Sequence, residues 1–254
     1  MIVVAIAAGL IGYVIGKPAS PQAQDKATDA SEKPAEPQEP AFMKEGLVAY
    51  YPFNGNAKDE SGNGNDGKMN NANPISDRFS ADASSINFST EKPANILLGS
   101  SSLFDPEEDF AVFSWIKREE DGHQSIFTKC GGDENNAFWF GTYDSELHFT
   151  VNNDGAGDEY YGARMSKGAE IPLSTWCHVG ITRIKESLTY FVNGVAVDKE
   201  KADYIFSSGS SAVTVGTTAS GSQSSGSIDD VRIYNRALTE EQAKALYDLE
   251  KPKE

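Results

Sequence analysis

The stretch WCHVGITRIKESLTYFVNG, residues 176–194, contains two runs of apolar and β-branched residues on either side of Lys185-Glu186. This pattern predicts a β-hairpin, because the runs have strand length and two polar residues suit a tight turn. A second stretch, FAVFSWIKR at residues 110–118, carries apolar side chains on both alternating faces. A strand of that kind is buried on both sides. Together the two stretches indicate an all-β protein with a covered central strand.

The rest of the chain after residue 46 repeats the same short signals. One segment near the C-terminus is helical instead: Thr239 and Gln242 form a capping box, and Ala243, Leu246 and Tyr247 form an apolar stripe. A parallel α/β fold is excluded because crossover helices are missing. We therefore predict an antiparallel two-sheet jelly-roll sandwich with a short C-terminal helix. The remaining strands are expected at residues 47–53, 95–99, 125–129, 137–143, 146–152, 212–216 and 226–236.

Two segments of different character precede the predicted sandwich. Residues 1–16 hold an uncharged apolar run that is short for a membrane span, which needs about 20 residues. We interpret it as an N-terminal apolar helix acting as a signal anchor, with a cleaved signal peptide as the close alternative. Residues 17–42 contain five prolines and no apolar periodicity, which predicts a disordered linker. The sandwich is expected at 43–250, followed by a tail at 251–254.

Charge and cysteine content narrow the class of partner. The formal net charge is -16, from 22 Lys and Arg against 38 Asp and Glu. Nucleic acid is therefore excluded as a partner, because phosphate binding needs a basic surface. Cys130 and Cys177 lack the neighbours of a zinc site. They are either one disulfide of an exported protein or two buried thiols.

Four stretches, taken in order, resemble the laminin-G-like, concanavalin-A-like jelly-roll family found in bacterial surface proteins. They are GLVAYYPFNGNAKDESGNGNDGK, FAVFSWIK, WCHVGITRIKESLTYFVNG and GSIDDVRIYNRALTEEQAKALY. One departure is Cys177, where the family usually has histidine. The resemblance implies the jelly-roll fold and a bacterial envelope location, either membrane-anchored or secreted. Members of the family bind glycans, proteins or no known partner, so the fold does not determine the activity.

A catalytic site is not expected. Glycoside hydrolases of this shape need two carboxylates at a fixed separation, and no Glu-x-Asp-x-x-Glu pattern is present. Asp229 and Asp230 are adjacent, and consecutive strand residues point to opposite faces. The same reasoning separates Cys177 from His178. A hydrolase is therefore the least favoured of the functions considered.

The stretch DESGNGNDGK, residues 59–68, suggests either a solvated turn or a cation-binding loop. Asp59, Ser61 and Asn63 stand at positions 1, 3 and 5 of an EF-hand-like loop, but position 12 is Asn70 rather than glutamate. The stretch is therefore not an EF-hand.

The family resemblance implies a structural calcium between the opening loop and the closing strand. Its ligands here would be Asp59 and Asn54, joined to Asp229 in SIDDV. The alternative is that the Asn-Gly and Asp-Gly pairs of this loop are ordinary turns.

Candidate ligand-binding residues lie in two polar segments between the predicted strands. We expect contacts from Tyr143 and from the loop at 152–164, while Trp139 is expected in the core. The hypothesis is a non-catalytic, surface-displayed binding module for carbohydrate or glycoprotein. The alternative is a protein-binding or adhesive envelope protein that binds no sugar. The candidates in the loop are Asn153, Asp158, Tyr160 and Tyr161.

Overall fold

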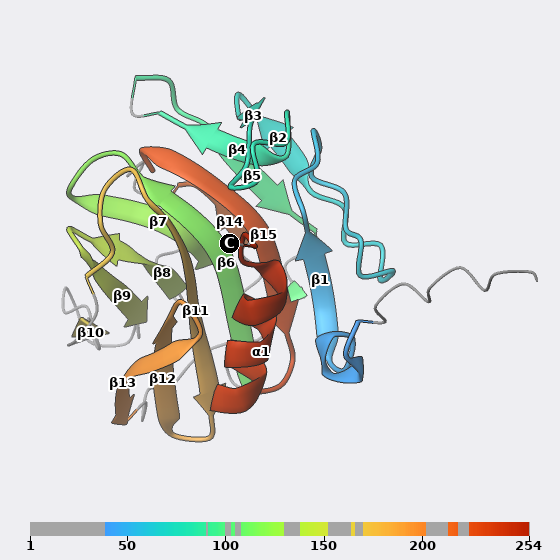
Figure 1. Cartoon of the computed structure of the whole chain (residues 1–254), viewed down its shortest axis with the longest axis vertical. Coiled ribbons are helices and arrows are strands. Elements are labelled where there is room, and N and C mark those ends of the chain that lie inside the picture. Colours follow the sequence, from blue (N-terminus) through green and yellow to red (C-terminus); the bar gives the residue numbers. More distant parts are fainter. Residues whose placement is uncertain are drawn as a thin grey trace, which may run out of the picture. The chain divides into compact units, whose positions relative to one another are not determined.

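The computed structural model of the chain describes residues 39–89, 91–99, 103–104, 108–129, 138–151, 164–165, 170–201, 213–217 and 224–253. Residues Glu39–Glu254 form one compact unit. Its strands build two antiparallel sheets, and a single α-helix follows near the C-terminus (Figure 1). The predicted all-β sandwich is confirmed.

The larger sheet has eight strands, and its central strands are β6 and β15. Every pairing between these strands is antiparallel, and β1 pairs with β15 outside the main order. The order is β13 (Val195–Lys201), β12 (Ser187–Val192), β11 (Trp176–Ile184), β6 (Phe110–Arg118), β15 (Gly226–Tyr234), β4 (Ser85–Phe88) and β3 (Asn73–Ile75), with β1 at Leu47–Tyr51.

The smaller sheet has seven strands and faces the first across the interior. The hairpin of β8 and β9 turns at Asp144, which has a φ of 50°. The order is β10 (Arg164–Met165), β9 (Glu146–Val151), β8 (Phe138–Tyr143), β7 (His123–Lys129), β14 (Val213–Val215), β5 (Asn95–Leu98) and β2 (Lys68–Asn70).

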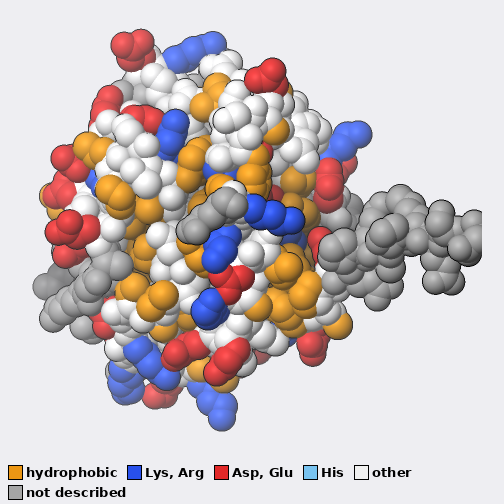
Figure 2. All heavy atoms as spheres, in the orientation of Figure 1, with side chains coloured by type: hydrophobic (Ala, Val, Ile, Leu, Met, Phe, Trp, Pro, Cys, Tyr) orange, Lys and Arg blue, Asp and Glu red, His pale blue; other side chains and the backbone are white. Residues whose placement is uncertain are grey.

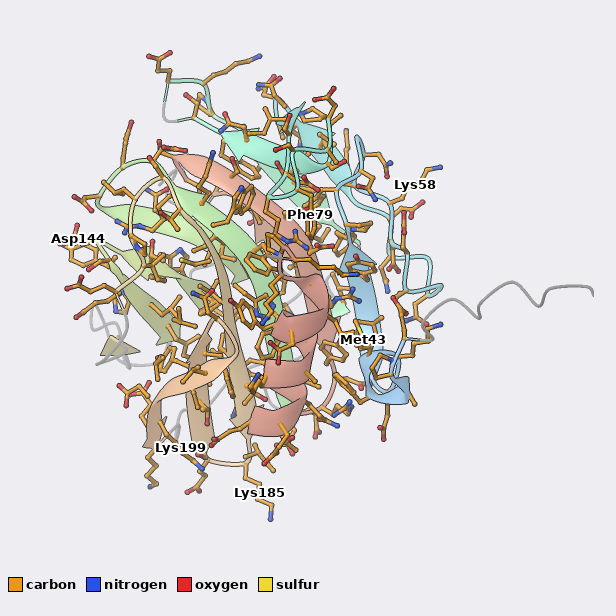
Figure 3. The ribbon with its side chains drawn as sticks, viewed as in Figure 1. Met43, Lys58, Phe79, Asp144, Lys185 and Lys199 are labelled. Atoms are coloured by element: carbon orange, nitrogen blue, oxygen red, sulfur yellow. The ribbon has the colours of Figure 1, made fainter. Side chains whose placement is uncertain are left out.

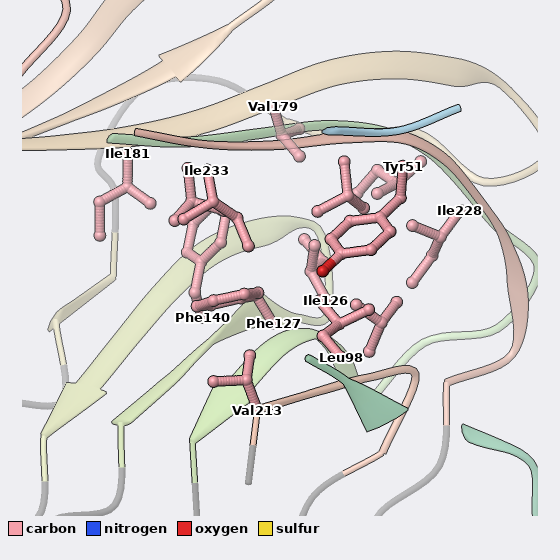
Figure 4. Close-up of a cluster of buried hydrophobic side chains, with 14 of the residues drawn as sticks. Tyr51, Leu98, Ile126, Phe127, Phe140, Val179, Ile181, Val213, Ile228 and Ile233 are labelled. Carbon is pink, nitrogen blue, oxygen red and sulfur yellow. The ribbon is translucent and has the colours of Figure 1, made fainter. Parts of the chain in front are cut away.

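The interior is a continuous apolar cluster between the two sheets. Figure 4 shows aromatic and branched side chains from both sheets pointing toward one another, including Tyr51, Phe127, Phe140 and Ile233. Phe138 lies at the centre of an aromatic group, with its ring centroid 4.8 Å from that of Phe104. Burial of this apolar surface is the main force that holds the sheets together.

Strand β6 is covered on both faces, as its sequence predicts. Val112 and Ile116 belong to the interior cluster, whereas Ala111 and Phe113 belong to a second cluster on the outer face of the eight-stranded sheet. That second cluster includes Leu246 of α1 (Glu240–Glu250), and α1 crosses this face in Figure 1. The helix therefore supplies the second cover that the sequence of β6 requires.

The capping box at the start of α1 is also confirmed. The Thr239 hydroxyl accepts a hydrogen bond from the Gln242 amide, and the Gln242 side chain accepts one from the Thr239 amide. The short 3-10 helix η1 (Ala41–Met43) is the first element of the compact unit in the sequence. Its Met43 side chain is buried in the same outer cluster as α1. Both ends of the unit thus reach one cluster.

Five strands were not predicted: β2, β3, β4, β10 and β13. Four of them have two to four residues. The fifth, β13, is an edge strand whose last four residues are charged, with acidic and basic side chains in turn. Within the described part of the chain, no helix is long and apolar enough to cross a membrane. The predicted anchor at 1–16 and most of the predicted linker lie outside the described residues.

Candidate functional site

An aromatic triad, Trp139, Tyr143 and His148, lies on the outer face of the seven-stranded sheet. Residues 139, 141 and 143 of β8 share this face, and Gly141 pairs with His148 of β9. The ring centroids of Trp139 and His148 are 5.4 Å apart, and those of Tyr143 and His148 are 6.3 Å apart. Three rings from two neighbouring strands thus gather on one surface.

Gly141 makes this arrangement possible. A Cβ atom at this position would lie 2.6 Å from the indole ring of Trp139 and 2.0 Å from the Gln124 carbonyl oxygen. The Trp139 indole therefore lies across the backbone of β8, where any side chain at 141 would displace it. Trp139 is buried, but it does not belong to the interior cluster. The expectation that Trp139 is buried is therefore confirmed, but strand alternation places it on the outer face of the sheet rather than between the two sheets.

Polar side chains surround the triad. Glu146 pairs with Tyr143 across the hairpin, and Thr150 pairs with Trp139. Tyr143 is 38% exposed, so its ring is accessible at the hairpin tip beside Asp144 (Figure 3). Tyr143 is the exposed ring of the triad, and an exposed ring beside carboxylate and hydroxyl groups suits a ligand with both apolar and polar faces.

Tyr143 is the predicted ligand-binding residue that the structure describes. The others, Asn153, Asp158, Tyr160 and Tyr161, lie outside the described residues, as does Cys130. Cys177 is a free thiol that packs in the interior cluster. Burial raises the pKa of this thiol, which opposes formation of a reactive thiolate.

Asp59, one of the predicted calcium ligands, organises the opening loop through hydrogen bonds. Its carboxylate accepts bonds from the backbone amides of Tyr50, Ser61 and Asn65, at 3.0, 2.9 and 2.9 Å. Burial opposes ionisation of this group, but these hydrogen bonds outweigh burial and hold the pKa of Asp59 below its usual range. Asn54 is exposed, and its carbonyl oxygen accepts a bond from the Asn56 side chain.

Asp229, the third predicted ligand, is buried on the outer face of the eight-stranded sheet. One carboxylate oxygen lies 2.7 Å from Nη1 of Arg78, and the other accepts the backbone amide of Asp230. Burial and the neighbouring Asp230 raise the pKa of Asp229, and the ion pair with Arg78 opposes that rise. In the described part of the chain, no group of three or more His, Cys, Asp or Glu side chains is placed to hold a metal.

Asp230 contacts the same arginine, which corrects the expectation that adjacent aspartates point to opposite faces. Its carboxylate lies 2.6 Å from Nη2 of Arg78. The cause is a β-bulge: the register of β15 against β6 shifts between Asp229 and Arg232, and Asp230 has a φ of 48°. A bulge re-aims side chains that regular pleating would separate. Both carboxylates are paired with a guanidinium, so neither resembles a catalytic acid or base.

Arg78 connects the segment between β3 and β4 to the end of α1. Its Nε donates to the Glu250 carbonyl oxygen at 2.9 Å, and its guanidinium lies 4.5 Å from the Trp115 ring. Sequence reasoning missed this residue, because nothing near 78 marks it as a partner of positions 150 residues away. We call the buried set Arg78, Trp115, His178, Asp229, Asp230, Arg232 and Glu250 the Arg78 cluster.

Two facing antiparallel sheets and a short helix define this protein as a jelly-roll β-sandwich. A family model described as the concanavalin A-like lectin/glucanases superfamily matches residues 90–244, which is more than half of the chain. The chain belongs to this superfamily, as the four sequence stretches predict. No curated protein matches the sequence.

Several solved structures share the fold. Domain 4 of AbnA, a GH43 extracellular arabinanase from Geobacillus stearothermophilus solved in complex with arabinotriose, has a TM-score of 0.64 and 19% identity, covering 79% of this chain and 98% of that one. The binding domain of Paraclostridial Mosquitocidal Protein 1 has a TM-score of 0.64 and 17% identity, covering 82% and 53%.

A third similar structure is the binding domain of botulinum neurotoxin DC in complex with rat synaptotagmin II. Its TM-score is 0.60 at 14% identity, and the match covers 82% of this chain and 52% of that one. The chain thus spans about half the length of the two toxin domains. At these identities the likeness establishes the fold.

Proposed function

We propose that this protein is a non-catalytic binding module for carbohydrate or glycoprotein, displayed outside the cytoplasm of a bacterium. The observation that carries the proposal is the exposed Tyr143 ring of the aromatic triad, with polar side chains beside it on an outer sheet face. Aromatic rings accept the apolar faces of sugar rings, and neighbouring carboxylate and hydroxyl groups bind sugar hydroxyls. The family supports the proposal, since it groups lectins with glucanases.

The charge of the protein favours a neutral ligand over an anionic one. Acidic and basic side chains are interspersed on the face seen in Figure 2, but the formal net charge is -16. A polyanionic glycan would be repelled over the distance of a Debye length. Neutral sugars, or neutral regions of a glycoprotein glycan, are therefore the proposed ligands.

Replacing Tyr143 with alanine is expected to weaken glycan binding by about tenfold or more, a loss of about 1.4 kcal/mol. The full chain is first screened on a glycan array, and the affinity for the best ligand is then measured by calorimetry for both proteins. The melting temperature should stay within a few degrees, because Tyr143 is exposed at a hairpin tip.

The matched control for this experiment is Phe79→Ala, in the segment between β3 and β4 of the other sheet. Phe79 is 51% exposed near the C-terminal end of α1, as Figure 3 shows. Its removal should leave glycan affinity unchanged. An array without any bound glycan, or equal losses for the two variants, would contradict the proposed site.

The alternative function is protein binding without sugar. Its specific support is the exposed pair Phe79 and Leu249, each 51% exposed. Asp77 holds the Phe79 segment by accepting the amides of Phe79 and Ala81 at 2.7 and 2.9 Å. A rigidly held exposed ring is a common anchor of protein interfaces. This function is preferred if no glycan on the array binds and if the wild type captures a protein ligand that Phe79→Ala does not capture.

The structural calcium implied by the family stays a prediction, with Asp59, Asn54 and Asp229 as its proposed ligands. If calcium binds, adding it at about 100 times its Kd should stabilise the folded protein by about 2.7 kcal/mol, and chelation should reverse the effect. The measurement is thermal melting with calcium, with magnesium and with chelator. Equal melting temperatures in all three would contradict calcium binding, and an Asp59→Asn variant should lose any calcium response.

A further inference from the structure

The carboxyl group of Glu250, the last residue of α1, is buried against three strands. Its Oε1 accepts a hydrogen bond from Nε of Arg232 at 2.7 Å, and its Oε2 accepts one from Nε1 of Trp115 at 3.1 Å. The same Oε2 lies 3.8 Å from Nε2 of His178. The end of the helix is therefore fixed to β15, β6 and β11 through a single carboxyl group.

His178 is fully buried, and neither of its ring nitrogens has a hydrogen-bond partner among the described residues. Its ring stacks on Phe113 with a centroid separation of 5.4 Å and lies 5.3 Å from the Trp115 ring. A neutral imidazole has one nitrogen that accepts a hydrogen bond. The Glu250 carboxyl, whose Oε2 lies 3.8 Å from Nε2, can point a donor at it when that carboxyl carries a proton.

The charge balance of the Arg78 cluster also requires a proton. Three carboxyl groups face two guanidinium groups, so a fully ionised cluster would keep one uncompensated negative charge in the interior. Burying an unpaired charge is costly, and the usual response of such a group is to bind a proton. Burial raises the pKa of Asp229 to about 9, but both oxygens of Asp229 and both of Asp230 already accept hydrogen bonds from N–H or O–H donors. Only Oε2 of Glu250 also faces an imidazole acceptor.

We propose that Glu250 keeps its proton up to neutral pH and directs it at Nε2 of His178, 3.8 Å from Oε2, so that docking of the α1 C-terminus depends on pH. The only bond that breaks is the O–H bond of this carboxyl group. At higher pH its proton leaves to solvent, and the carboxylate that remains repels the other acidic groups. The groups that face Glu250 are Arg232 and Asp230 on β15, Arg78 between β3 and β4, Trp115 on β6, His178 on β11, Tyr247 on α1, and Tyr50 on β1, which donates to Asp230.

The direction of the pH effect follows from the two ionisation equilibria. Burial raises the pKa of Glu250 to about 7 from 4.5, and Arg232 only partly offsets this rise. Burial, with Arg78 and Arg232 nearby, lowers the pKa of His178 to about 3, so the imidazole accepts rather than carries the proton. A carboxyl group whose pKa is raised by docking stabilises the docked state below its undocked pKa, and this contribution is lost as the pH rises through about 7.

The test is amide hydrogen exchange of α1 in the full chain between about pH 6 and about pH 8.5. After correction for intrinsic rates, the protection of its C-terminal turn should fall about tenfold over this range. This fall follows from a Glu250 pKa of about 7 in the docked state and 4.5 in the undocked state. Glu250→Gln cannot ionise, so its protection should change less than about twofold. The matched control is Glu240→Gln, an exposed carboxyl at the start of the same helix, which should keep the wild-type tenfold change.

His178→Phe should shift the loss of protection to lower pH, because the proton acceptor is removed while the stacked ring is kept. A second measurement, infrared spectroscopy of the wild type, should show a protonated carboxyl band that loses intensity with a midpoint near pH 7, well below the pKa of about 9 to which burial raises the Asp229 carboxyl. This midpoint identifies Glu250 even if Glu250→Gln fails to fold. Absence of this band, an unchanged tenfold fall in Glu250→Gln, or protection that rises with pH in the wild type would overturn the proposal.

Discussion

Replacing Arg78 with methionine is expected to lower the free energy of unfolding by about 3–5 kcal/mol, the usual cost of removing one partner of a buried ion pair. The Arg78 side chain is 3% exposed and pairs with two buried carboxylates, Asp229 and Asp230. Methionine fills a similar volume but donates no hydrogen bond, so both carboxylates would be left without their cation. Urea denaturation of the two proteins measures the difference.

The matched control is Lys44→Met, which removes a cation from an exposed pair with Glu39. The two side chains are 77% and 55% exposed and 3.9 Å apart, so the change should cost less than about 1 kcal/mol. Adding Asp229→Asn to Arg78→Met should restore part of the lost stability, since it removes one unpaired charge. Similar losses for Arg78→Met and Lys44→Met would contradict a dominant role for the buried pairs.

Phe138→Ala should cost about 3–5 kcal/mol, the range observed for truncating a fully buried aromatic ring. Its ring lies 4.8–5.3 Å from the centroids of Phe104, Phe149 and Phe127, which all belong to the interior cluster. The cavity left by its removal would be lined by rigid rings that fill it poorly. Differential scanning calorimetry and urea denaturation both report the loss.

The control for Phe138→Ala is Phe79→Ala, which removes the same phenyl ring from an exposed position. That variant should lie within about 1 kcal/mol of wild type, because the exposed ring contributes mainly a contact with the Arg78 guanidinium 4.5 Å away. If the two phenylalanine variants were equally stable, the assignment of residue 138 to the centre of the core would be wrong.

The fold was largely predictable because its main strands are long and their patterns are strong. Strands β6 and β11 begin and end at the predicted residues, and the capping box placed the helix start correctly. Four of the five missed strands have only two to four residues, too few for a clear periodic pattern, and β13 is largely charged. They pair with stronger neighbours, and that dependence on tertiary context is invisible in a single short segment.

The candidate site was less predictable, for two physical reasons. Alternation in β8 places Trp139 outside, but whether a tryptophan faces inward depends on which face the opposing sheet covers. The partners of Arg78 come from strands and a helix far away in sequence, so no local pattern reports them. Tyr143, a predicted ligand-binding residue, is 38% exposed beside a turn, and its role in binding stays a prediction.

The β-bulge in β15 also restricts which residues position 230 can hold. Its backbone has a φ of 48°, a region that asparagine, aspartate and glycine enter with less strain than other residues. The position must also supply a negative charge to Arg78 and an acceptor to the Tyr50 hydroxyl. Asparagine and glycine meet the backbone requirement without the charge, and glutamate supplies the charge at a backbone cost. Aspartate alone satisfies both, so natural variation at this position should be narrower than at any exposed carboxylate of the protein.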